Sequence, residues 1–146
     1  MFRRDMLANS PCLRAALDLA AKKSNWGQPL PPRVGRGVCA QPSYGSFIAT
    51  VTEAEVDEQG EVQVRRVTCA VDMGIAVNPD TIKAQLEGGG SFGLTAALCG
   101  QITIEKGRVQ QSNFNNYRMM RIDQAPQIDV HVINSREAPG GSEKPA

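Results

Sequence analysis

The stretch FIATVTEAEVDEQGEVQVRRVTCAV, residues 47–71, decides the fold. Residues 47–56 are rich in Val, Thr and Ile, which favour strands, and residues 57–60 (Asp-Glu-Gln-Gly) are typical of a turn. The chain then returns over 62–71 with a second apolar run. The apolar positions of this return change faces, from Val62 and Val64 to Val67, Cys69 and Val71. The stretch predicts a long β-hairpin with a bulge or bend near Arg65-Arg66.

Helical patterns flank this hairpin. Residues 11–24 predict a helix, because Ser10 can act as the N-cap, Pro11 suits the first helical position, and apolar residues follow at helical spacing. A second helical stretch at 80–98 is expected to be interrupted at Gly88-Gly89-Gly90, since each glycine costs a helix roughly 1 kcal/mol relative to alanine. A short hairpin is expected at 102–109 and a last strand at 127–133. The predicted fold class is α+β, a long β-hairpin packed with a glycine-interrupted helix.

The length of 146 residues corresponds to one domain. We divide it into an N-terminal helix with a proline-rich connector, residues 1–32, and an α+β body, residues 33–146. The 16 Lys and Arg residues nearly cancel the 15 Asp and Glu residues, which disfavours a non-specific nucleic-acid binder. No apolar run reaches the ~18 residues of a membrane span, and no signal peptide is present. On this chain alone we expect a cytoplasmic location, and we leave a periplasmic one open for a full-length protein.

The four cysteines, Cys12, Cys39, Cys69 and Cys99, lie 27 to 30 residues apart, and His131 is the single histidine. This spacing lacks the paired ligands of zinc fingers and iron–sulfur clusters, so no protein-held metal site is predicted. Because the chain lacks a secretion signal and is not a short loop-rich scaffold, we expect free, mostly buried thiols.

Two short motifs match known signatures by letters alone. Residues 35–40 fit the dinucleotide-binding G-x-G-x-x-G/A pattern, but prolines on both sides disfavour the strand and helix that it requires. Residues 89–93 fit the nucleophile elbow G-x-S-x-G, with Asp129 and His131 as triad partners of Ser91. Two residues apart on a strand, Asp129 and His131 would point side by side, which is poor triad geometry. We reject both interpretations.

Gln85 and the run Gly88, Gly89 and Gly90 form a more informative candidate site. A glutamine side chain donates and accepts hydrogen bonds at once, and glycines let a polar planar ligand approach the backbone. The same glycines could instead serve close packing of a helix on a sheet. The residues alone leave both readings open.

The order of motifs along the chain resembles the C-terminal half of the large, molybdopterin-binding subunit of molybdenum hydroxylases, the xanthine dehydrogenase and aldehyde oxidase family. The likeness is strongest to the isoquinoline 1-oxidoreductase and aldehyde oxidoreductase β subunits. The residues that carry it run from Phe2-Arg3-Arg4-Asp5-Met6-Leu7 through Asn25-Trp26-Gly27, Gly35-Arg36-Gly37, Ser43-Tyr44-Gly45-Ser46, Val67-Thr68-Cys69-Ala70-Val71-Asp72-Met73-Gly74, Val77-Asn78-Pro79-Asp80, Gln85-Leu86-Glu87-Gly88-Gly89, Phe92-Gly93-Leu94, Gln111-Ser112-Asn113-Phe114 and Ile128-Asp129-Val130-His131.

This resemblance implies an oxidoreductase that hydroxylates an N-heterocycle or an aldehyde with oxygen taken from water. It implies a molybdenum cofactor, molybdopterin extended as a cytosine dinucleotide, with Gln85 and Gly88–Gly90 facing it. It also implies two partners, a small subunit that carries the iron–sulfur clusters and the remainder of the large subunit. The substrate cannot be chosen from these residues.

The resemblance further implies a catalytic glutamate in a terminal loop, which here is Pro139-Gly140-Gly141-Ser142-Glu143-Lys144-Pro145. Aligned without a gap, Lys144 falls at the glutamate position; with one residue deleted, Glu143 does. A lysine is cationic at neutral pH and cannot act as this base unless it is strongly desolvated. Glu143 is therefore our candidate base.

The resemblance covers only part of such a subunit, so we expect residues 1–146 to form a single partial domain, and whether the isolated chain is an enzyme stays open. The alternative is a non-catalytic, truncated remnant that acts only as a structural or interaction module. Neighbouring reading frames that encode the missing half and a small iron–sulfur subunit would favour the enzyme.

Overall fold

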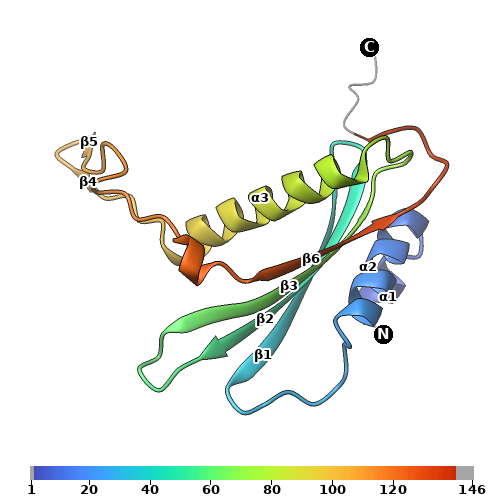
Figure 1. Ribbon diagram of the computed structural model, residues 1–146, viewed down its shortest axis with the longest axis horizontal. Helices are drawn as coiled ribbons and strands as arrows, with labels where there is room; N and C mark the ends of the chain where they lie inside the picture. The colour runs from blue at the N-terminus through green and yellow to red at the C-terminus, as the bar shows by residue number, and fades with distance from the viewer. Residues whose placement is uncertain (1, 141–146) are drawn as a thin grey trace.

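The computed structural model describes residues 2–140, which form one four-stranded sheet with helices on both faces (Figure 1). The sheet order is β1-β2-β3-β6, and a separate two-stranded hairpin, β4-β5, lies away from the sheet. The α+β class is confirmed. The elements are α1 (Phe2–Met6), α2 (Pro11–Lys23), β1 (Val34–Ser43), β2 (Ser46–Val56), β3 (Val62–Asp72), α3 (Pro79–Leu98), β4 (Ile104–Glu105), β5 (Arg108–Val109), the 3₁₀ helix η1 (Ile122–Gln124) and β6 (Gln127–Ile133).

The predicted long hairpin is strands β2 and β3, which pair antiparallel along their whole length. Glu53 pairs with Arg66 and Ala54 with Val64, so Arg65 is an extra residue in β3. The predicted bulge is therefore confirmed. The extra residue brings the two apolar sets of β3 onto the same face, because Val64 and Val67 pair with Ala54 and Thr52, which are alternate residues of β2.

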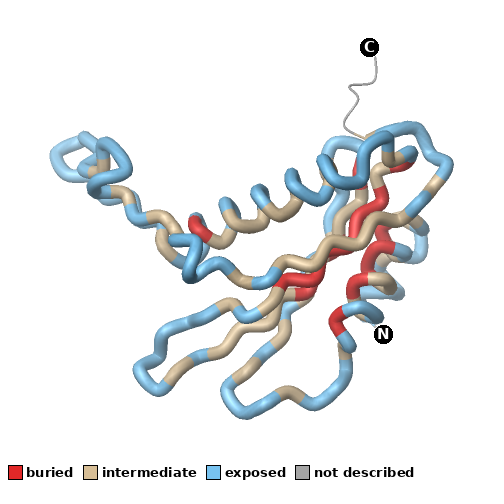
Figure 2. Tube along the Cα trace, viewed as in Figure 1, coloured by how far each residue is buried: buried red, intermediate tan, exposed pale blue. Residues whose placement is uncertain are grey.

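The core lies between α2 and one face of the sheet. Ala16, Leu17 and Ala20 of α2 pack against Ala49 and Val51 of β2 and Ala70 of β3. Small side chains at these contacts let the helix axis approach the sheet closely, and the buried residues cluster along this seam (Figure 2). Ser10 occupies the N-cap position as expected, but its side chain makes no capping hydrogen bond.

Strand β1 was not predicted from the sequence. Its residues alternate between half-buried and exposed positions, but Gly35 and Gly37 occupy exposed positions and an arginine, Arg36, turns inward. Arg36 Nε donates a hydrogen bond to Glu53 Oε1 of β2 at 2.9 Å, which makes the inward charge acceptable. Residues 35–40 thus lie within edge strand β1, which also contains Pro42 and leads into β2 and not into a helix. This excludes the dinucleotide-binding interpretation.

Helix α3 corrects the expected interruption, because it runs unbroken from Pro79 to Leu98 through all three glycines. Asn78 Oδ1 caps its first turn by accepting from the backbone N–H groups of Asp80 and Thr81. The middle of the helix also packs on β6. Capping and packing together outweigh the glycine cost, as tertiary contacts commonly override intrinsic propensity.

The thiols are free among the described residues, as expected, but they are not mostly buried. Cys69 alone is buried, in β3, and burial raises the pKa of its thiol to about 11. Cys39 is exposed because it lies on the outer side of edge strand β1, whereas Cys12 and Cys99 are half-buried.

This order predicts the course of thiol labelling. In the folded protein near neutral pH, a maleimide should modify Cys39 first and leave Cys69 unmodified until denaturant is added, because only an accessible thiolate reacts. Peptide mass mapping over time measures this. Early modification of Cys69 would show that β3 is not buried as described.

Candidate cofactor-binding surface on helix α3

Helix α3 has an outward face that carries most of the predicted cofactor-contacting residues. With 3.6 residues per turn, Gln85, Gly88, Gly89 and Phe92 lie on one side of the helix, and all four are exposed. Figure 2 shows this side as a largely exposed strip facing away from the sheet. The structure therefore brings Gln85, Gly88 and Gly89 together on one open surface.

The three glycines divide into two groups. A Cβ atom added at Gly88 or Gly89 would meet nothing within 4 Å, whereas one at Gly90 would lie 3.2 Å from Ile128 Cδ1 of β6. Gly90 is thus accounted for by packing of the helix on the sheet. No contact among the described residues accounts for Gly88 and Gly89, so the packing explanation fits one glycine of the run and not the other two.

Several polar side chains of α3 interact with other residues of the same helix, and Gln85 takes no part in these interactions. Ser91 Oγ donates to the Glu87 carbonyl at 2.9 Å, and Thr95 Oγ1 donates to the Ser91 carbonyl at 3.0 Å. Lys83 Nζ lies 3.6 Å from Glu87 Oε1, one turn away. These interactions run along the helix and leave the outward surface at Gln85 and the two open glycines clear.

Ser91, Asp129 and His131 match the order of a catalytic triad in the sequence, but the structure does not bring them together. Ser91 lies on α3, on the side of β6 that Ile128 faces, and residues alternate along a strand, so Asp129 and His131 face α2 instead. Asp129 Oδ2 accepts from Arg66 Nε at 2.6 Å. The sheet separates the serine from the other two residues.

The pKa shifts of Asp129 and His131 arise from contacts that hold the sheet and α2 together. Burial opposes the ionised form of Asp129, but hydrogen bonds from Gln127 and Arg66 and the charge of Arg66 favour it more, so its pKa lies below the usual value. Burial and the charge of Lys23 on α2 lower the pKa of His131. At neutral pH Asp129 is therefore the acceptor of an ion pair with Arg66, and His131 is an uncharged ring.

The end of the described chain lies next to the loop that leads into α3. The backbone N–H of Ile75 donates to the Glu137 carbonyl at 3.2 Å, and that of Gly140 donates to the Met73 carbonyl at 2.7 Å. Glu143 and Lys144, the two alternatives for the catalytic base, lie outside the described residues. Composition and spacing do not single out the residues that hold this segment; Met73 and Gly140 enter only through the resemblance, in Val71-Asp72-Met73-Gly74 and in the terminal loop.

Two absences concern residues 2–140 only. In that part of the chain no group of three or more His, Cys, Asp and Glu side chains could hold a metal ion. Nor does it contain a helix long and apolar enough to cross a bilayer.

Curated proteins match the chain over most of its own length. It is 35% identical over 144 residues to isoquinoline 1-oxidoreductase subunit beta of Brevundimonas diminuta, which covers 96% of this chain and 18% of that protein. It is 32% identical over 130 residues to the membrane-bound aldehyde dehydrogenase (pyrroloquinoline-quinone) of Gluconacetobacter polyoxogenes, which covers 85% of this chain and 17% of that protein. The chain thus spans less than a fifth of either relative.

Solved structures share the fold. Quinoline 2-oxidoreductase from Pseudomonas putida 86 superposes with a TM-score of 0.60 and 18% identity, covering 66% of this chain and 13% of that one. A family model for the molybdopterin cofactor-binding domain matches residues 10–126, which include all of α3. The chain therefore belongs to the molybdopterin cofactor-binding domain family.

Proposed function

We propose that this chain forms a cofactor-contacting part of a molybdenum hydroxylase, and that Gln85, Gly88 and Gly89 contact the pyranopterin or its cytosine dinucleotide tail. The observation that carries the proposal is the open surface of α3, where Gly88 and Gly89 have no neighbour to explain them. The match of the cofactor-binding family over residues 10–126 supports it.

The residues of this surface fit such a ligand. A pterin is planar and polar, so it needs a donor and an acceptor in one plane and a backbone that it can approach closely. Gln85 supplies the amide donor and acceptor, and the two glycines supply backbone without Cβ atoms. Gly90 is better assigned to packing on Ile128, which narrows the proposed contacts to three residues.

The bound cofactor would supply the redox chemistry, a hydroxylation of an N-heterocycle or an aldehyde with oxygen from water. This chain's own residues bind and orient the cofactor, and Glu143 accepts a proton. Iron–sulfur clusters on a small partner subunit would take up the electrons. The α3 surface is exposed in the described chain, and the remainder of the large subunit would cover it. Phe92, which is 71% exposed on this surface, would be covered as well.

The test uses the enzyme assembled from this chain, the remainder of the large subunit and the small iron–sulfur subunit, hereafter the assembled enzyme. Supplied with an N-heterocycle or an aldehyde in ¹⁸O-labelled water, it should release a hydroxylated product that carries the label. Hydroxylated product without label would contradict water as the source of the oxygen, and a stable complex with no turnover on either substrate class would favour the non-catalytic remnant.

A further inference from the structure

The segment 134–140 is held in place by the loop that follows β3. Besides the two backbone hydrogen bonds from Ile75 and Gly140, Gly74 adopts φ +77°, and a Cβ atom there would collide with the carbonyl oxygens of Glu137 and Ala138. A Cβ atom at Gly140 would likewise collide with Ser46 Oγ. Both glycines are therefore required by close contact between backbone segments.

Asp72, the last residue of β3, stands at the centre of these contacts. It is 4% exposed, and its Oδ1 accepts a hydrogen bond from Ser135 Oγ at 2.7 Å and another from the Gly74 backbone N–H at 3.1 Å. The Cys12 thiol at the start of α2 also donates to its side chain, and burial and the negative charge of Asp72 raise the pKa of Cys12. One buried carboxylate thus ties three separate parts of the chain together. We call Asp72, Gly74 and Ser135 the terminal clamp.

A buried carboxylate is costly unless several donors satisfy it, so this site is held together only while the three donors stay in place. Met73, which lies between Asp72 and Gly74 of the clamp, holds Gly140 through its carbonyl, and Glu143 follows Gly140 by three residues in the sequence. Three residues of extended chain span at most about 11 Å, so the position of Gly140 sets the point from which the terminal loop starts.

We propose that Asp72 is a positioning residue for the terminal loop, acting through Ser135 and Gly74 to hold the segment that leads to the base. This inference rests on the proposed function, in which Glu143 accepts the proton. Asp72 does not touch the reacting atoms in this account; it fixes where the loop begins, and small displacements of a base are costly in catalysis.

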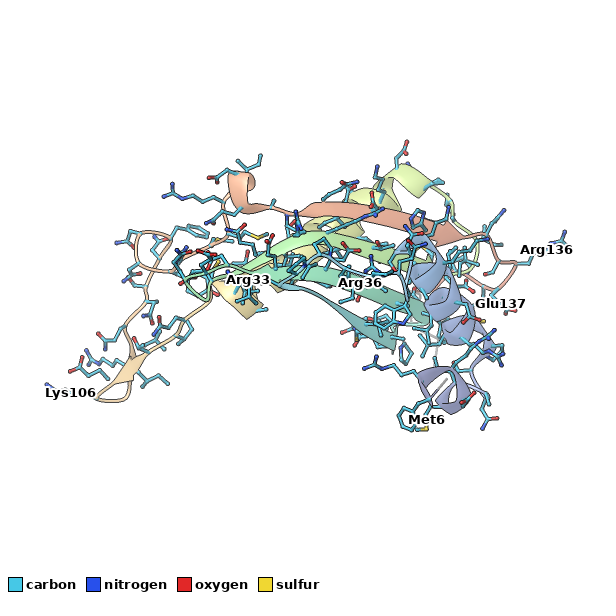
Figure 3. The ribbon with its side chains drawn as sticks, turned by 90° about the horizontal axis from the view of Figure 1, so that it is seen from below. Met6, Arg33, Arg36, Lys106, Arg136 and Glu137 are labelled. Atoms are coloured by element: carbon cyan, nitrogen blue, oxygen red, sulfur yellow. The ribbon has the colours of Figure 1, made fainter. Side chains whose placement is uncertain are left out.

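A structural readout tests the clamp without any assay of activity. Arg136 is exposed and points away from the body (Figure 3), so tryptic cleavage after it reports local opening of segment 134–140. In the assembled enzyme, Asp72→Ala should speed this cleavage, and amide exchange at Gly140, roughly 10- to 100-fold, because charge-assisted hydrogen bonds are lost. Ser135→Ala, which removes a single hydrogen bond, should give a smaller increase and serves if Asp72→Ala does not fold. Asp72→Asn keeps an acceptor oxygen and should restore most of the protection.

The matched control is Asp129→Ala. Asp129 joins β3 to β6 through Arg66, and this pair has the same sequence separation, 63 residues, as Asp72 and Ser135. It lies away from the clamp, so its loss should leave cleavage after Arg136 unchanged. Equal acceleration in both variants would mean general destabilisation and would overturn the proposal.

The kinetic readout separates this inference from the proposed base. Asp72→Ala should lower kcat with little change in KM, and Asp72→Asn should recover much of the rate. Glu143→Gln is measured in parallel. If Glu143→Gln abolishes turnover and Asp72→Ala does not change kcat, the positioning role is wrong and the base stands. If neither variant changes kcat, the assignment of Glu143 as the base and the positioning role of Asp72 are both wrong. This holds whatever the cleavage experiment shows about the clamp.

Discussion

Replacing Glu143 by glutamine in the assembled enzyme is expected to lower kcat by roughly 10²–10⁴-fold, the range that general-base catalysis contributes. Glutamine keeps the size and shape of the side chain but cannot accept the proton as a carboxylate does. Because the proposed cofactor contacts lie on α3, molybdenum content should stay at the parent level. Steady-state turnover and metal analysis of the same preparation measure the two quantities.

The control for this experiment is Lys144→Gln, at the neighbouring position that a gap-free alignment places at the base. A lysine is protonated at neutral pH and does not serve as the base, so its replacement should leave kcat within a few-fold of the parent. Parent turnover in Glu143→Gln would remove Glu143 from the site.

Replacing Gly88 by alanine is expected to strengthen the helix and weaken cofactor binding at the same time. The position is helical and open, so alanine should raise the free energy of unfolding by up to about 1 kcal/mol. The added methyl group would stand between the backbone and the pterin, so the purified enzyme should contain less molybdenum. Thermal melting and metal analysis report the two effects separately.

Gly93 provides the matched control, since it lies on the same helix, is exposed, and also has nothing within 4 Å of an added Cβ. It is turned by about 140° around the helix axis from Gly88 and lies one turn beyond Gly89, at the end of the proposed surface. Gly93→Ala should stabilise the protein in the same way but lower the molybdenum content less than Gly88→Ala does. An equal loss of cofactor in both variants would argue against a contact at Gly88.

The local pattern was strong enough to predict the β2-β3 hairpin and its bulge. The change of apolar face between Val64 and Val67 can be met only by a strand that bends or gains a residue, and the structure places the extra residue at Arg65. Strand β1 could not be predicted from the sequence, because the residues that face the core side of the sheet include a charged one, Arg36. The acceptability of that charge depends on Glu53, a partner that pairing alone brings near.

The candidate site shows the same division between local and distant information. A run of three glycines beside Gln85 was visible as a signal, but only the position of Ile128 in β6 separates Gly90 from the two open glycines. The helix α3 is continuous partly because it packs against β6. Intrinsic helix propensities of the residues do not include that contact. Asp72 could not be recognised, because its donors Cys12 and Ser135 lie 60 and 63 residues away in sequence.

We propose above all that this chain helps to hold a molybdenum cofactor through the outward surface of α3. The most direct test of this proposal is the molybdenum content of the purified assembled enzyme, compared between the parent and Gln85→Ala. We expect about one molybdenum per large subunit in the parent, with a pterin and a cytosine nucleotide released on denaturation, and a clear loss of molybdenum in the variant at unchanged folding. A folded parent enzyme that contains no molybdenum, or a Gln85→Ala enzyme that retains all of it, would contradict the account.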